Sequence, residues 1–150
     1  MLEKISTCTY KMTHSEKEEL TIFHIVAESN LELQISNGFY EPDSLKTEGF
    51  IHCTSGKSVL LSVAEDYYSD AKGPFLILEI NLSKIQSQVK FEAPSPIPGG
   101  GKSHMEHTSS FPHIYGALNI SAINSIGVLS RKDGKFVWPK EFMTPSIFGI

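Results

Sequence analysis

Residues 49–55 read Gly-Phe-Ile-His-Cys-Thr-Ser, a stretch that combines a glycine break, an apolar pair, a histidine and three small polar side chains. This order predicts a short strand followed by a helix, with Ser55 at the helix N-cap. His52 would then lie near a strand-to-helix junction, where a fixed backbone presents an accessible side chain to a ligand. The alternative is a half-buried histidine whose ring bonds a backbone carbonyl.

Before this stretch the sequence predicts one strand and one helix. Residues 21–26 are mostly β-branched and aromatic, which favours a first core strand with His24 at its middle. A helix is expected next, with Leu31 and Ile35 on its inner face and Leu33 a further candidate for it. Asn37 and Gly38 would close that helix as a C-cap pair.

After the stretch, residues 57–68 predict a second helix, because apolar side chains recur there at offsets of three and four. Residues 75–82 are apolar almost without interruption, which predicts a central strand covered on both faces. Further strands are expected at residues 89–92, 122–129 and 136–138, the last after a hairpin-like turn at residues 132–135.

The domain organisation follows from composition. We expect residues 1–20, which are polar and carry no motif, to form an N-terminal extension, and residues 21–150 to form a single domain. Between residues 93 and 112 the composition changes to Pro, Gly, Ser and His. A loop of this length in a compact domain is mobile or functional, often a lid.

The overall charge and the cysteine content exclude several classes of function. Thirteen basic and 17 acidic residues give a formal charge of −4, which argues against a broad nucleic-acid interface. Two cysteines supply neither a disulfide framework nor a four-cysteine zinc site. Because no apolar run reaches membrane-spanning length, we expect a cytoplasmic protein without a membrane partner.

The histidines and Cys53 raise the questions of metal binding and of nucleophilic catalysis. His104 and His107 have a spacing that permits metal binding, but they lack an acidic-helix arrangement and would need His24 or His52 to complete a tetrahedron, so no metal is expected. Neighbouring strand residues point to opposite faces, so His52 is badly placed to activate Cys53, which we interpret as a buried apolar cysteine.

Three segments resemble the signature blocks of a family called domain of unknown function 952. They are Ile22-Phe23-His24-Ile25-Val26, Gly49-Phe50-Ile51-His52-Cys53-Thr54 and Phe111-Pro112-His113-Ile114-Tyr115-Gly116-Ala117-Leu118. The resemblance covers about residues 21–130.

More distantly, the order of elements resembles the ADP-ribosyltransferase superfamily. There, a first-strand histidine holds the NAD ribose and a later strand-to-helix segment forms the nicotinamide pocket. His52 and the residues after it look most like the His-hydrophobic-Ser segment of the RNA 2′-phosphotransferase branch. Two departures stand out: Ile25 follows His24 where those enzymes usually have glycine, and no clear match to the catalytic glutamate exists. Glu79 and Glu106 are the candidates for a carboxylate.

These resemblances imply an α+β single domain with a split, mostly antiparallel sheet flanked by helices, and a histidine-lined cleft for NAD or another small nucleotide. We assign His52 and His113 to catalysis, and His24, Thr54, Ser55, Tyr67 and Tyr115 to cofactor binding. The implied activity is that of an NAD-using or nucleotide-using transferase, with the acceptor left open. The alternative is a non-catalytic module that keeps the fold and binds a nucleotide or peptide.

Overall fold

The structure is a computed structural model that describes residues 13, 20–93 and 111–150. Nearly all of the predicted N-terminal extension, and the predicted loop after residue 93, lie outside the described residues. His104, Glu106 and His107 lie outside them as well.

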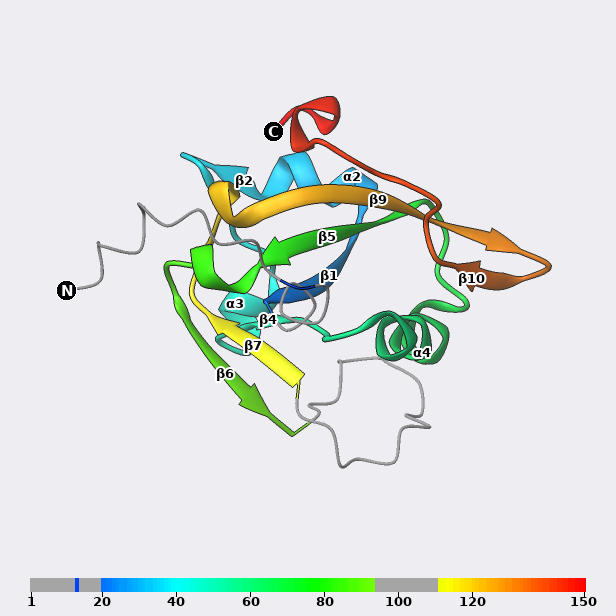
Figure 1. The fold of residues 1–150 in the computed structure, drawn as a ribbon, viewed down its shortest axis with the longest axis horizontal. Helices are drawn as coiled ribbons and strands as arrows, with labels where there is room; N and C mark the ends of the chain where they lie inside the picture. The colour runs from blue at the N-terminus through cyan, green and yellow to red at the C-terminus, as the bar shows by residue number, and fades with distance from the viewer. Residues whose placement is uncertain (1–12, 14–19, 94–110) are drawn as a thin grey trace.

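The main sheet is built around β5 (Phe75–Asn81), which lies between β1 (Thr21–Ala27) and β9 (Ile123–Lys132) (Figure 1). Both pairings are antiparallel. β5 is buried along almost its whole length, which confirms the central strand predicted from its apolar sequence. Two short strands, β10 (Lys135–Val137) and β11 (Phe142–Met143), also pair with β9.

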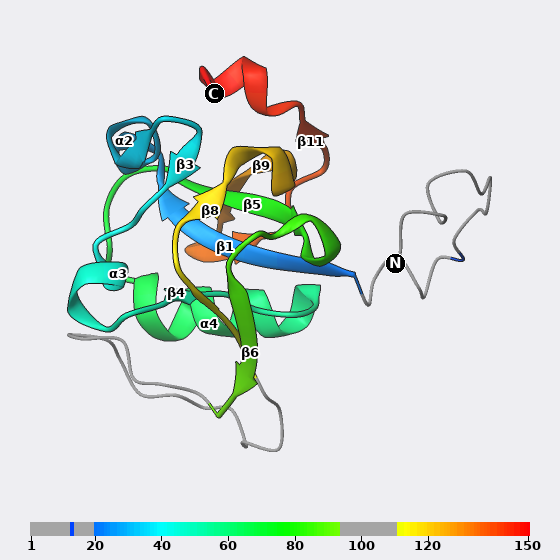
Figure 2. The ribbon, with the colours of Figure 1, turned by 90° about the vertical axis from the view of Figure 1, so that its left-hand side faces the viewer.

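Two small antiparallel sheets complete the fold. One has the order β4-β7-β6, and Figure 2 shows β6 running across the direction of β1. The other has the order β2-β3-β8. Their strands are β4 (Ile51–His52), β7 (Phe111–Tyr115), β6 (Gln88–Glu92), β2 (Ile35–Ser36), β3 (Phe39–Tyr40) and β8 (Leu118–Asn119).

Helices are few and mostly short among residues 20–93 and 111–150. The α-helices of these residues are α2 (Glu28–Leu31), α3 (Ser44–Thr47) and α4 (Lys57–Tyr68). Single 3₁₀ turns occupy Glu32–Gln34, Leu82–Lys84, Ile120–Ala122 and Pro145–Phe148. None of the helices in the described part of the chain is long and apolar enough to cross a membrane. The predicted α+β class with mostly antiparallel sheets is confirmed.

The two faces of the main sheet bury separate clusters. On one face, Leu78 packs in a cluster with Ile51 and Ile114 of the β4-β7-β6 sheet. On the other, Ile77 packs with Leu60 of α4. This alternation follows from the two-residue period of a strand, and it fixes α4 and the β4-β7-β6 sheet to one scaffold.

Three local predictions are wrong. The helix expected before residue 38 ends at Leu31, and Leu33 is 82% exposed because the chain turns through a 3₁₀ segment into a hairpin. Asn37 and Gly38 have φ values of 52° and 81°, so they form the hairpin turn between β2 and β3 and not a helix C-cap. Ser55 is not the N-cap of α4, since Gly56 occupies that position with a φ of 91°.

Candidate functional site

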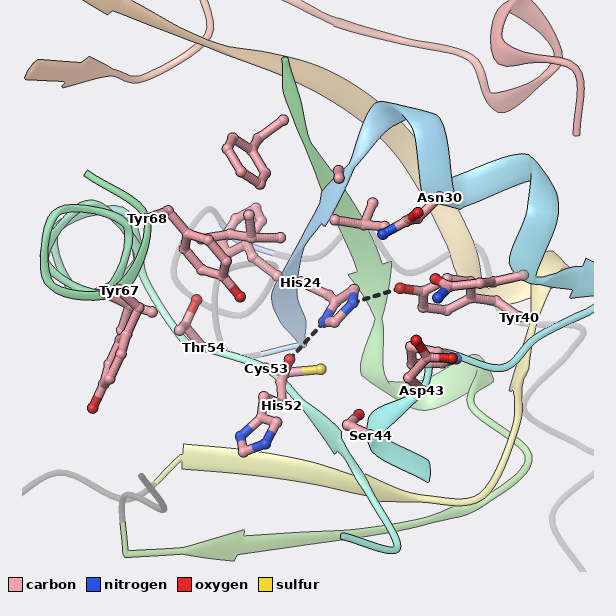
Figure 3. Close-up of a pocket in the computed structure, with 18 of the residues that line it drawn as sticks. His24, Asn30, Tyr40, Asp43, Ser44, His52, Cys53, Thr54, Tyr67 and Tyr68 are labelled. Atoms are coloured by element: carbon pink, nitrogen blue, oxygen red, sulfur yellow. Dashed lines mark hydrogen bonds between the residues drawn. The ribbon is translucent and has the colours of Figure 1, made fainter. Parts of the chain in front are cut away.

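A cavity of about 460 Å³ lies where β1 and β4 separate. Its walls come from β1, from α4 and from the segment between β3 and β4. In Figure 3, Tyr67 and Tyr68 of α4 stand on one side and Tyr40 on the other, with His24 between them. The lining is mostly apolar and aromatic, and its volume falls within the usual range for small-molecule sites.

The separation of β1 from β4 creates the cavity. Phe23 of β1 and Thr54, two residues after the end of β4, exchange two backbone hydrogen bonds, each 2.8 Å long, in an isolated bridge. One position further along β1, the ladder stops and Nδ1 of His24 donates to the carbonyl oxygen of His52 over 2.6 Å. Where β1 and β4 separate, a side-chain hydrogen bond therefore replaces a backbone hydrogen bond.

His24 is held in one tautomer. A carbonyl oxygen only accepts, so Nδ1 carries the proton, and Nε2 accepts from the Tyr40 hydroxyl over 2.8 Å. Burial lowers the pKa of His24 to about 4, so the ring is neutral at pH 7. Burial also raises the pKa of Tyr40 far above its ordinary value, which keeps the hydroxyl as a donor. Both ring nitrogens of His24 are thus engaged within the protein.

Thr54 carries a polar atom without a partner. Its side chain lines the cavity, the residue is 6% exposed, and Oγ1 is the buried side-chain nitrogen or oxygen of the described residues that makes no hydrogen bond. Leaving a buried hydroxyl unpaired costs on the order of 1–3 kcal/mol. Such an atom in a cavity wall indicates a position where a ligand would complete the bond. The neighbouring Cys53 is no nucleophile, because burial raises the pKa of its thiol well above 9.

Two carboxylate–histidine pairs lie side by side, with their histidines on β4 and β7. His52 and His113 are directly opposite in the antiparallel register, and their ring centroids are 5.6 Å apart. Nε2 of His52 lies 3.0 Å from Oε2 of Glu48, and Nδ1 of His113 lies 2.8 Å from Oε1 of Glu92. The strand register therefore brings two imidazoles together, each oriented by its own carboxylate.

Tyr115 belongs to the second pair. Its hydroxyl donates to the same Glu92 oxygen over 2.6 Å. Hydrogen bonds from Tyr115 and His113 lower the pKa of Glu92, so this carboxylate is ionised at neutral pH. The same bond raises the pKa of Tyr115.

The structure brings together most of the side chains that the sequence assigned to a site. His24, His52, His113, Thr54 and Tyr67 all line the cavity, whereas Ser55 and Tyr115 do not. Ser55 is exposed at the start of α4.

Of the two glutamates proposed as the carboxylate, Glu79 is not part of the described cavity wall. Glu79 accepts a 2.6 Å bond from Ser125 on β9 and is absent from the lining, and Glu106 lies outside the described residues.

The sequence did not indicate Tyr40, Glu48 or Glu92. Glu48 lies four residues before His52, a spacing that was available as a signal, but the roles of Tyr40 and Glu92 depend on contacts with distant strands.

The charges on the lining are all acidic. Among its described residues, Asp43 and Glu48 are the carboxylates, and no lysine or arginine is present. Within the part of the chain that the structure describes, no group of three histidine, cysteine or carboxylate side chains is placed to hold a metal ion.

Comparison with known proteins gives a family and a fold. A family model described as "Protein of unknown function (DUF952)" matches residues 25–126. The crystal structure of protein CC0527 from Caulobacter crescentus is 18% identical, with a TM-score of 0.57, over 87% of this chain and 99% of that one. The solution NMR structure of CC0527 matches with a TM-score of 0.55, at 18% identity over 81% and 92% of the two chains. At this identity the likeness shows the fold alone. No curated protein matches.

Proposed function

The chain belongs to the DUF952 family, whose description assigns no activity, and from the cavity we propose that it binds a nucleoside-type ligand as an NAD-using transferase of the ADP-ribosyltransferase type. The observation that carries the proposal is the buried, unpartnered hydroxyl of Thr54 in the wall of the cavity. A hydroxyl in that position selects a ligand that offers a complementary polar atom.

The remaining lining suits a ring attached to a sugar. Tyr67 and Tyr68 present aromatic surface on one wall, and burial raises the pKa of Tyr68, so its hydroxyl stays uncharged. Asn30 supplies an amide on the opposite side (Figure 3). The neutral ring of His24 adds no positive charge.

The nicotinamide–ribose half of NAD fits this lining better than the pyrophosphate does. The pyridinium ring of NAD is cationic, and Asp43 and Glu48 are the charged residues of the described wall. A pyrophosphate would find no lysine or arginine among those residues, so it would lie outside the cavity. The carboxylates would also favour positive charge on the ribose as the bond to nicotinamide breaks.

The second candidate is a binding module without catalysis. It is favoured by one observation: both ring nitrogens of His24 are already bonded, to the His52 carbonyl and to Tyr40, so neither is free for a ribose hydroxyl. The transferase is favoured by a different observation: three histidines and two carboxylates lie on the same cavity wall.

Ligand binding tests the proposal directly. Calorimetry and thermal shift with NAD, nicotinamide riboside and adenosine should show binding of the first two and a raised melting temperature. Thr54→Val should weaken that binding about ten-fold, because the ligand loses one hydrogen bond at a buried site, without lowering the melting temperature of the free protein.

Thr144→Val is the matched control, since Thr144 is exposed and does not line the cavity. No binding of any of the three compounds, or equal affinity in the wild type and Thr54→Val, would contradict the proposal. Release of nicotinamide from NAD separates the transferase from the binding module.

A further inference from the structure

In the pair formed by His113 and Glu92, the hydrogen bond determines which nitrogen of the imidazole carries the proton. Glu92 is ionised and its oxygen only accepts, so Nδ1 of His113 carries the proton and donates across 2.8 Å. Nε2 of a neutral His113 is therefore the nitrogen with the lone pair. The hydrogen bond of the ring to Glu92 uses Nδ1 and leaves Nε2 out, and His113 is part of the cavity wall.

The ring of His113 is fixed in place. The residue is 3% exposed, and the ring of Phe50 stacks on it at 4.2 Å with an interplanar angle of 24°. His52 meets it at 76°. Packing and the bond to Glu92 thus determine both the orientation and the tautomer, which is the arrangement that a general base requires.

The other two histidines of the cavity do not match this arrangement. Both nitrogens of His24 are bonded within the protein, and burial lowers its pKa to about 4. In His52, the nitrogen that approaches a carboxylate is Nε2, so that nitrogen faces Glu48. His113 is the histidine of the described wall whose Nε2 is left open by a carboxylate on Nδ1.

We infer that His113 is the general base of the transfer reaction, that Glu92 is its positioning residue, and that the acceptor is a hydroxyl group or water. The inference rests on the proposed function. Nε2 takes the proton from the acceptor O–H, and the acceptor oxygen bonds to the ribose carbon. The bond from that carbon to the nicotinamide nitrogen breaks, its electron pair leaves with neutral nicotinamide, and the imidazolium returns its proton to solvent.

Nitrogen NMR of the imidazole rings tests the pair without any ligand. In its neutral form, His113 should be protonated on Nδ1, whereas free histidine favours Nε2. Glu92→Gln should keep the Nδ1 proton because the amide oxygen still accepts, and Glu92→Leu should lose it. Protonation of Nε2 in the wild-type protein would overturn the inference whatever the ligand is.

Kinetics with NAD as probe and water as acceptor give the second test. Nicotinamide release should fall by about 10²–10⁴-fold in His113→Gln and Glu92→Leu through kcat, with KM nearly unchanged, and Glu92→Gln should be intermediate. Gln88→Leu is the control, since Gln88 is exposed on the same strand and lies opposite Tyr115.

The outcomes are distinguishable. Wild-type turnover that the Glu92 and His113 variants retain overturns the assignment of the base and leaves the proposed function standing. Binding of NAD without any wild-type turnover overturns the base and supports the binding module. Absence of both binding and turnover overturns the proposed function, and the base with it.

Discussion

His24 is a buried base that the fold keeps neutral, and this links the stability of the protein to pH. The folded pKa is about 4 and the ordinary value is 6.5. Between these values the unfolded chain binds a proton that the folded chain does not. The free energy of unfolding should therefore be highest above pH 6.5 and fall by about 3 kcal/mol as the pH drops to 4.

Urea denaturation at pH 7 and pH 4.5 measures this dependence. Glu92, whose pKa is also lowered, acts in the same direction, because stability is lost as its carboxylate is protonated. His24→Gln isolates the histidine contribution, since glutamine does not titrate, and its curve should be flatter than that of the wild type. Equal slopes for the two proteins would show that His24 is not the group responsible.

The candidate site was partly predictable at the level of single residues. His24, His52 and His113 each fall in a short segment dense in apolar side chains, which suggested that they converge on one cleft. In the structure all three line the cavity. Glu92 could not be found in this way. It reaches His113 because Lys90 lies opposite His113 in the register of β6 and β7, and Glu92 is two residues further on the same face. That pairing is long-range and leaves no local pattern.

At the scale of elements, the spacing of apolar residues predicted a helix correctly, whereas the residues of a turn were assigned to the wrong structure. α4 spans residues 57–68, as its apolar spacing predicted, because that pattern is contained within the helix itself. The Asn37-Gly38 pair is compatible both with a helix end and with a hairpin turn. The pairing of β3 with β8, some 80 residues away in sequence, selects the hairpin.

The geometry of the β2–β3 turn predicts how two substitutions change the unfolding free energy. Gly38 has a φ of 81° and empty space around the position of a Cβ, so Gly38→Ala should cost about 1 kcal/mol of unfolding free energy through backbone strain alone. Asn37→Gly, at a φ of 52°, should change stability by less than about 0.5 kcal/mol. Chemical denaturation of both variants measures the contrast, and equal losses would argue against the turn.

At the scale of the whole molecule, the sheets share one core and should unfold together. Ile51 and Ile114 of the β4-β7-β6 sheet pack in the same cluster as Leu78 and Ile126 of the main sheet. Loss of either sheet would expose the other, so a single cooperative transition is expected.

Two probes on different parts of the fold test this cooperativity. Trp138 packs edge-on against Phe23 in the other cluster, so its fluorescence reports on the α4 side of the main sheet. Methyl NMR signals of Ile51 and Ile114 report on the β4-β7-β6 sheet. The two urea midpoints should coincide, whereas an earlier loss of the methyl signals would mean that the small sheet opens by itself.

The hydrogen bond that the imidazole of His24 makes where β1 and β4 separate has a use for protein engineering. Backbone ladders hold neighbouring strands at about 4.8 Å, a distance that no mutation alters. The link from His24 to the His52 carbonyl is set by the reach of one side chain. In a small library at position 24, asparagine reaches as far as Nδ1 of histidine and glutamine reaches one bond further. These variants would change the separation of β1 and β4 within one scaffold, so that a single codon adjusts the size of ligand admitted.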